Sequence, residues 1–323
     1  MSNPMITREK IVDFIRSRPG LKIPPLEKEA GIPPQTLSKA LLANAANIPK
    51  KHLPAIEEVL RQYGYSDNFD NGANPAHILS IVNHKGGVGK TTTVINLAKA
   101  LSLYGLRVLM IDMDSQGNLS QCYNIHEPET QIIDSLLSDA EIPVLPIADN
   151  LFLAPSDIRM AARESDLMNS IGSERRLTIK LNAIKDQYDY ILIDCPPSLG
   201  ICTTCSLVAS SDCIVPIQAE ASAYHGVANL LNHISDIRTF ANPSLNIKGF
   251  VFTMIDKRLN LHADMMEHIK NSFQGIHVFD TIISQSKAVK ESQVAKEDLF
   301  TSDPASVPWN QYKSLATELL KLQ

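Results

Sequence analysis

A short glycine-rich stretch holds the residues of this sequence best suited to chemistry. It follows a run of aliphatic residues and precedes a helical pattern, and its members are Lys85, Gly86, Gly87, Val88, Gly89, Lys90, Thr91 and Thr92. Glycines let backbone N–H groups converge on phosphate oxygens, and the positive end of the following helix adds to the attraction. In such a loop a lysine reaches the outer phosphates and a hydroxyl binds Mg²⁺. The stretch therefore predicts a site for ATP with Mg²⁺, with Lys90 on the phosphates and Thr91 on the metal.

The loop departs from the general phosphate-loop pattern in a specific way. Where that pattern has its first glycine this chain has His84, and a second lysine, Lys85, stands ahead of the glycines. This order is the deviant Walker A loop, and with its flanks it resembles that of the ParA/MinD family of dimerising ATPases. In that family the extra lysine reaches the partner's phosphates across a nucleotide-sandwich dimer. The resemblance therefore implies a homodimer when ATP is bound, with Lys85 acting in trans.

Two further segments resemble this family. Residues 108–118 look like its D-x-D-x-Q-G-N segment, with Ser115 in place of the usual proline, and residues 188–198 look like its Walker B strand. The resemblance implies that Asp114 orients the attacking water, so that Lys85, Lys90 and Asp114 form the catalytic set. It also places Asp112 beside the metal, and Asp194 holding Mg²⁺ through water.

The resemblance covers residues 77–321 and is strongest to the DNA-partition branch. It implies that Met254 and Asp256 lie near the adenine. One departure is that the family's usual Ile-Pro-Arg is Ile283, Ser284 and Gln285 here. Partners implied by the branch are nonspecific DNA and a ParB-like centromere-binding protein that stimulates an otherwise weak ATPase. Basic residues that could contact nonspecific DNA are Lys257, Arg258, Lys270, Lys287, Lys290 and Lys296.

Short aliphatic runs must position these groups. They alternate with helical patterns, as in parallel α/β folds, and they occupy residues 78–82, 108–111, 151–153, 190–193, 213–217 and 247–252. Continuous apolar character is typical of strands buried on both faces. The predicted fold class is α/β, a mostly parallel twisted sheet with helices on both faces, as in P-loop NTPases.

The first residues predict a separate, all-helical unit. A helix over about residues 6–17 is followed by a helix from Pro25, a tight turn at Gly31, a second helix over residues 34–41, and a third helix over residues 53–63. This order predicts a helix-turn-helix that reads DNA. The polar outer face leaves four residues for base edges and phosphates, Gln35, Thr36, Ser38 and Lys39. The alternative is a helical arm used only for packing or dimerisation.

The predicted division is therefore a helix-turn-helix domain over residues 1–64, a linker over 65–76 rich in turn-forming residues, and the ATPase domain over 77–323. With the N-terminal unit, the chain resembles the larger plasmid ParA proteins, which repress their own operon. An operator is then a second DNA partner.

Charge and composition narrow the function further. The formal net charge is −5, but residues 1–75 hold ten Lys/Arg and eight Asp/Glu, whereas the rest holds twenty and twenty-seven. DNA contacts in the larger part must then come from local basic patches. No apolar run approaches the roughly 20 residues that cross a bilayer. The five cysteines lack disulfide-framework spacing and read as buried or half-buried thiols. We expect a cytoplasmic, nucleoid-associated protein without membrane contact.

Three other functions share parts of this pattern. The chain could act mainly as a transcriptional regulator. MinD-like positioning ATPases end in an amphipathic helix with a basic face, whereas residues 309–323 look like a packed terminal helix. Iron–sulfur reductases share the loop, but the cysteine pattern that binds their cluster is missing from this sequence, where Cys202 and Cys205 stand alone as a C-x-x-C pair.

Overall fold

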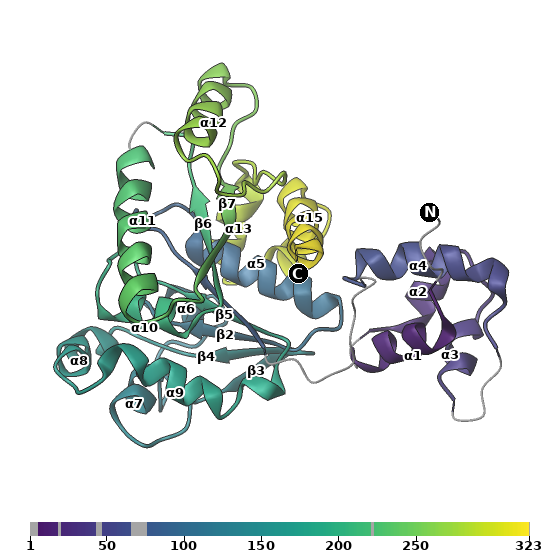
Figure 1. Ribbon diagram of the computed structural model, residues 1–323, viewed down its shortest axis with the longest axis horizontal. Coiled ribbons are helices and arrows are strands. Elements are labelled where there is room, and N and C mark those ends of the chain that lie inside the picture. Colours follow the sequence, from purple (N-terminus) through teal and green to yellow (C-terminus); the bar gives the residue numbers. More distant parts are fainter. Residues whose placement is uncertain (1–5, 19–20, 43–46, 66–75, 221–222, 323) are drawn as a thin grey trace.

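Four helices and a 3₁₀ turn form the N-terminal unit in the computed structural model, which describes residues 6–18, 21–42, 47–65, 76–220 and 223–322 (Figure 1). Their apolar faces meet in one buried cluster that includes Phe14, Leu26, Leu37 and Leu60. The elements are α1 (Arg8–Arg16), α2 (Ile23–Glu29), α3 (Thr36–Ala40), the 3₁₀ turn (Lys50–His52) and α4 (Leu53–Gln62).

The predicted helix pair at residues 25–41 is present, but its second helix is shorter than expected. Helix α3 begins at Thr36 rather than Pro34, because Gln35 has a left-handed backbone with φ 67° that cannot continue a right-handed helix. The predicted linker lies mostly outside the described residues, and the domain limits stay predictions.

The rest of the chain is built on one seven-stranded sheet in the order β3-β4-β2-β5-β1-β6-β7. All neighbours are parallel except β3 and β4, so the predicted α/β class is confirmed. The strands are β1 (His77–Ile81), β2 (Val108–Asp112), β3 (Leu145–Ala148), β4 (Leu151–Ala154), β5 (Tyr190–Asp194), β6 (Asp212–Ile217) and β7 (Asn246–Phe252). Edge strand β3 was not predicted, because it is short, largely exposed and contains a proline.

Helices cover both faces of the sheet because alternate residues of each buried strand point to opposite sides. In β2, Leu109 and Ile111 join one apolar cluster, whereas Val108 and Met110 join the other. The first cluster is covered by α7 (Ile132–Leu137), α8 (Arg159–Met168), α9 (Arg176–Asn182), α10 (Ile201–Ala209), α11 (Ala223–Phe240) and α12 (Asn260–Ser272). The second is covered by α5 (Lys90–Leu103), α6 (Asn118–Gln121), α13 (Lys287–Ala295), α14 (Leu299–Ser302) and α15 (Val307–Lys321).

The terminal helix α15 packs its apolar face against α5, as the sequence predicted for residues 309–323. Tyr312, Leu315 and Leu319 are buried there. Among the described residues no helix has the length and apolar character to span a membrane.

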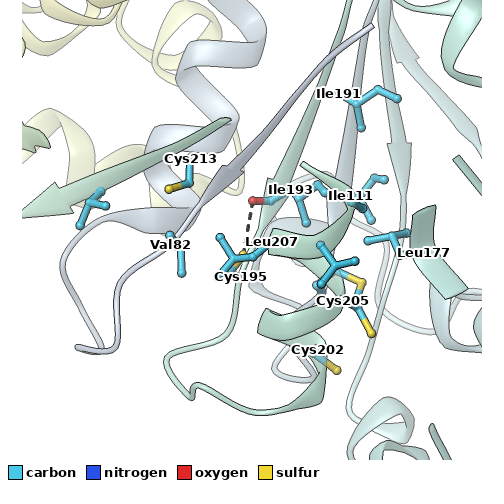
Figure 2. Close-up of a cluster of buried hydrophobic side chains, with 14 of the residues drawn as sticks. Val82, Ile111, Leu177, Ile191, Ile193, Cys195, Cys202, Cys205, Leu207 and Cys213 are labelled. Carbon is cyan, nitrogen blue, oxygen red and sulfur yellow. Dashed lines mark hydrogen bonds between the residues drawn. The ribbon is translucent and has the colours of Figure 1, made fainter. Parts of the chain in front are cut away.

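Four of the five cysteines lie in the apolar core on one face of the sheet. Figure 2 shows Cys195, Cys202, Cys205 and Cys213 among aliphatic side chains such as Val82, Ile193 and Leu207. All five are free thiols, and Cys122 is half-buried. Burial raises the pKa of Cys195 to about 12, so this thiol stays protonated and inert. The prediction of unpaired, buried or half-buried thiols is confirmed.

The helical unit contacts the second part of the chain at the far end of α5. Gly105, with φ 81°, lies so close to Leu21 that a Cβ there would be 2.8 Å from the Leu21 backbone nitrogen. The rings of Tyr63 and Tyr104 meet edge to face at 5.2 Å between centroids. One helix therefore connects the glycine loop at its start with the helical unit at its end.

Candidate active site

The glycine loop lies at the carboxyl end of β1, between β5 and β6. Helix α5 starts at Lys90, directly after Gly89, whose φ of 89° turns the chain into the helix. A Cβ on Gly86 or Gly87 would meet nothing within 4 Å, so the loop backbone borders open space. This is the strand, loop and helix arrangement that binds phosphate groups at a helix N-terminus.

A cavity of about 590 Å³ opens over this loop. It is lined by most of the predicted loop residues and by Asp114 and Met254, which the sequence had also assigned to the site. The predicted lining residues are Gly86, Gly87, Gly89, Lys90, Thr91, Thr92, Asp114 and Met254. Val88 is buried beneath the loop, where its carbonyl accepts a hydrogen bond from the Thr253 hydroxyl at 2.8 Å.

Lys90 is buried at the start of α5, and its ammonium donates to the backbone carbonyl of Lys85 at 3.1 Å. Burial lowers the pKa of Lys90, while the nearby charge of Asp194 opposes that shift. A carbonyl is a weaker acceptor than a phosphate oxygen, so this contact occupies the ammonium without satisfying its charge.

Asp194 ends strand β5 and is 0% exposed. Neither carboxylate oxygen has a hydrogen-bond partner within the geometric limits among the described residues. Burial and the neighbouring Asp112 raise the pKa of Asp194 well above its usual value, whereas the Thr91 hydroxyl and the Lys90 ammonium lower it. A buried carboxylate with unused lone pairs is expensive unless a cation or hydrogen-bond donors complete it.

The oxygen atoms of Asp194 and of the neighbouring Thr91 hydroxyl are suitable ligands for a Mg²⁺ ion that binds together with a nucleotide. Carboxylate and hydroxyl oxygens suit this hard ion, which keeps several waters and takes further oxygens from phosphates. No group of three or more His, Cys, Asp or Glu side chains in the described part of the chain could hold a metal by itself. Thr91 and Asp194 therefore suit an ion that arrives with the phosphates.

Asp112 lies beside Asp194 but is already engaged. Its carboxylate accepts from the Ser120 backbone N–H at 2.9 Å, the Ser120 hydroxyl at 2.7 Å and the Asp114 N–H at 3.2 Å. Burial raises the pKa of Asp112 to about 7, with these hydrogen bonds opposing the shift. The structure thus shows Asp112 fixing the turn after β2, while its assignment beside the metal stays a prediction.

Asp114 faces the cavity from that turn. One carboxylate oxygen accepts from the Gln116 N–H at 3.0 Å, and its own carbonyl accepts from the Ser156 hydroxyl at 2.6 Å. These bonds fix the side chain toward the space over the loop. Its assignment to the attacking water stays a prediction.

Lys85 does not line the cavity. Its ammonium forms an ion pair with Glu220, which follows strand β6. The sequence predicts that Lys85 contacts the partner's phosphates across a dimer interface. In the single subunit its side chain lies at the surface and is paired with Glu220 instead.

Of the two residues assigned near the adenine, only Met254 borders the cavity; it has φ 56°. Asp256 lies in an adjacent pocket, where the Arg258 guanidinium donates to it at 2.6 and 2.9 Å. Hydrogen bonds from Arg258 lower the pKa of Asp256 to about 2. The structure therefore does not bring Asp256 to the loop.

Ser284, in the segment that departs from the family pattern, pairs reciprocally with Gln311 of α15. The Gln311 side chain accepts from the Ser284 N–H and donates to its hydroxyl, both at 2.8 Å. This polar pair connects the loop after β7 to the terminal helix.

Several cavity residues had not been assigned to the nucleotide site from the sequence, namely Gln116, Asn118, Gln121, Ser292, Lys296 and Glu297. Gln116 and Asn118 belong to the segment that resembles the family's D-x-D-x-Q-G-N, so this resemblance could have placed them at the nucleotide site. Lys296 had been grouped with basic residues for DNA. It lies at the cavity wall and its ammonium is 3.0 Å from the His126 ring.

The four residues assigned to DNA lie on and just before α3, and Gln35 and Lys39 are exposed. The buried Glu27 carboxylate accepts from the backbone N–H groups of Gln35, Leu37 and Ser38 at 2.8, 2.7 and 3.2 Å. At the other end, Arg8 and Arg16 of α1 donate to the carbonyls of Ala40 and Leu41, both at 3.0 Å. Charged side chains thus hold both ends of this five-residue helix.

Comparisons with known proteins agree with the geometry. A family model described as an AAA domain matches residues 76–247. The sporulation initiation inhibitor protein Soj of Bacillus subtilis is 37% identical over 247 residues, which cover 75% of this chain and 97% of Soj. The chromosome partitioning protein ParA of Caulobacter vibrioides is 36% identical, with 77% of this chain and 95% of that protein covered.

Solved structures share the fold. A crystal structure of cobyrinic acid a,c-diamide synthase from Mycobacterium smegmatis, with bound ADP and magnesium, is 31% identical and superposes with a TM-score of 0.66. The match covers 75% of this chain and 92% of that one.

Proposed function

This chain belongs to the ParA/MinD family of P-loop ATPases, and on that premise we propose that it is a DNA-partition ATPase. It binds ATP with Mg²⁺ over residues 84–92 and hydrolyses the γ-phosphate to drive the segregation of a replicon. The observation that carries the proposal is the buried, unsatisfied Asp194 carboxylate beside the loop that holds Lys90 and Thr91.

Each residue has a distinct part in hydrolysis. Phosphoryl transfer depends mainly on positioning and on neutralising charge in the transition state. Lys90 neutralises the phosphates from within the subunit, and Asp114 orients a water from the turn after β2. Thr91 and Asp194 hold Mg²⁺, which supplies charge stabilisation when bound. Lys85 adds a second ammonium from the partner subunit.

ATP binding then also controls assembly. Two ATP-bound subunits pair through Lys85, whereas the ADP-bound and empty forms are monomers, so the two states present different surfaces. The dimer binds nonspecific DNA on the nucleoid in the cytoplasm. A ParB-like protein on the cargo stimulates the weak basal hydrolysis and releases the dimer from DNA.

The helical unit adds operator binding in this proposal. Gln35 and Lys39 are exposed, and the ends of α3 are fixed by Glu27, Arg8 and Arg16. A rigid, solvent-facing helix is what a major groove accepts. We therefore include repression of the chain's own operon, and footprinting on its upstream DNA tests that part separately.

A MinD-like role in positioning on membranes is a second candidate. It needs a terminal amphipathic helix that is available to lipid. Here the apolar side of α15 is buried against α5, which supports the partition function instead.

Binding to a random-sequence DNA duplex with ATP, ADP or no nucleotide tests the motor. We expect binding with ATP and Mg²⁺ only, weakening steeply as salt rises because phosphate contacts release counterions. Equal binding in all three states would contradict an ATP-controlled motor and favour the purely regulatory alternative.

The Asp114→Ala variant tests the catalytic assignment. We expect an ATP-bound dimer that persists on DNA with little turnover, detected by phosphate release and by size-exclusion chromatography with light scattering. Wild-type turnover in this variant would remove Asp114 from the catalytic set.

A further inference from the structure

The end of β6 and the segment that follows it contact the glycine loop and the residue Asn83 before it at three points. The Asn83 side-chain amide donates to the Pro216 carbonyl at 2.7 Å, and the Gln218 amide donates to the Gly87 carbonyl at 3.2 Å. The third contact is the ion pair between the Lys85 ammonium and the Glu220 carboxylate. In the single subunit, these contacts therefore hold Asn83, Lys85 and Gly87 in place around the start of the glycine loop.

The backbone of Lys85 is also fixed, so its side chain starts from a defined place. The Lys85 N–H donates to the Asn83 side-chain oxygen at 2.9 Å, and its carbonyl accepts from Lys90 at 3.1 Å. Only the side chain can turn from Glu220 toward another anion. Both partners of the pair lie near the surface, with 32% and 51% of their side chains exposed, so solvent reaches both charged groups.

We propose that Glu220 is a latch that retains Lys85 in the single subunit and releases it when two ATP-bound subunits pair. This inference rests on the proposed function, because it takes the dimer contact of Lys85 as its second position. Glu220 is a positioning residue, since it lies outside the cavity lining and is proposed to act on the phosphate site through Lys85.

The ion pair between Lys85 and Glu220 must open before two subunits pair, so it weakens the ATP-dependent dimer. An exposed ion pair shifts an equilibrium by at most about fivefold. A symmetric dimer opens two such pairs, so the two effects multiply in the dissociation constant. Removing the carboxylate should therefore tighten the ATP-dependent dimer by roughly three- to twentyfold.

The test compares Glu220→Gln with the wild type by sedimentation equilibrium, using a non-hydrolysable ATP analogue and Mg²⁺. The variant keeps the size of the side chain but removes its charge, and we expect the tighter dimer given above. Because each subunit is negatively charged, losing any carboxylate lessens repulsion, so Glu267→Gln on α12 is the matched control. An unchanged or weaker dimer for Glu220→Gln relative to Glu267→Gln would overturn the latch.

A double-mutant comparison separates the latch from the proposed function. In a Lys85→Ala background, where the proposed function expects little or no pairing, Glu220→Gln should not restore pairing beyond the level reached with the control substitution Glu267→Gln. An equal gain with and without Lys85 also overturns the latch. If Lys85→Ala pairs as well as the wild type, the proposed contact of Lys85 with the partner's phosphates is wrong. The latch is then wrong as well, because it depends on that contact. If Lys85→Ala prevents pairing and Glu220→Gln changes nothing, only the latch is wrong.

The affinity of single subunits for nucleotide gives a second readout. Measured with a fluorescent ATP analogue below the concentration at which subunits pair, it should be the same for Glu220→Gln and the wild type. A loss of affinity there would show that Glu220 supports the ATP site itself and would overturn the latch.

Discussion

Asp112 and Asp194 lie side by side at the carboxyl ends of the parallel strands β2 and β5, in register and completely buried. Asp112 accepts three hydrogen bonds from Ser120 and Asp114, whereas the carboxylate oxygens of Asp194 accept no hydrogen bond of ordinary geometry within the described residues. The pKa of each is raised, first by burial. Two adjacent carboxylates thus differ, because Asp112 holds the turn after β2 whereas the Asp194 carboxylate is not engaged in such bonds, as the proposed Mg²⁺ role requires.

Replacing Asp194 by Asn should weaken Mg²⁺-dependent ATP binding by about 10- to 100-fold, the usual cost of losing a residue that supports a metal. The amide keeps the shape but lacks the charge that attracts Mg²⁺. Titration of a fluorescent ATP analogue with Mg²⁺ and with EDTA measures the effect. In EDTA the variant and the wild type should bind alike, and an unchanged Mg²⁺ dependence would contradict the assignment of Asp194.

The same variant should be more stable than the wild type without nucleotide, increasingly so as pH rises. A carboxyl whose pKa is higher in the folded than in the unfolded state binds extra protons when folded. It therefore costs stability as pH rises above its usual value of 3.8 through the folded pKa. We expect a Tm advantage of about 3 °C or more at pH 8, corresponding to roughly 1 kcal/mol in a domain of this size.

Thermal unfolding from pH 4.5 to 8 measures that advantage, which should shrink toward the acid end. Asp112 titrates in both proteins, but the two carboxylates interact, so the measured advantage also includes the loss of their mutual repulsion. A pH-independent difference would show that Asp194 is not a buried, uncompensated charge.

Replacing Glu27 by Ala should loosen helix α3. Three backbone N–H groups lose their acceptor at the start of a five-residue helix, which costs about 2 kcal/mol. Hydrogen exchange of residues 35–40 measures the change, and the exposed Glu58→Ala is the control. Protection equal to that of the control would contradict this account, while ATP binding should not change in either variant.

Replacing Gly105 by Ala should displace the helical unit from the end of α5. The new methyl would lie 2.8 Å from the Leu21 backbone nitrogen, and the position has φ 81°. The control is Gly275→Ala, which has a similar φ of 89° but no atom within 4 Å of the new Cβ. Small-angle scattering should show a larger radius of gyration for Gly105→Ala only, and equal radii would mean that the contact at Leu21 does not hold the units together.

A poorly satisfied charge also lies near that contact. Arg18 is 7% exposed, and its Nε and Nη1 have no hydrogen-bond partner among the described residues. Burial lowers the pKa of Arg18 to about 10, with the charge of Asp189 opposing the shift. Its guanidinium stacks on Phe14 at 4.4 Å from the ring centroid, which compensates only part of the desolvation.

The sequence by itself determined six of the seven strands, the glycine loop and the two strand-end carboxylates. Continuous apolar runs predict buried strands, and loop glycines with Lys90 and Thr91 predict a phosphate site, because both signals are local. Only the tertiary structure distinguished Asp112 from Asp194, since their hydrogen-bond partners come from the path of the chain after each strand. The tertiary structure also shows that Lys296 lies at the cavity wall, that Asp256 does not, and that Lys85 pairs with Glu220. Those contacts join residues far apart in the chain, and residue type and spacing do not encode which distant groups the fold brings together.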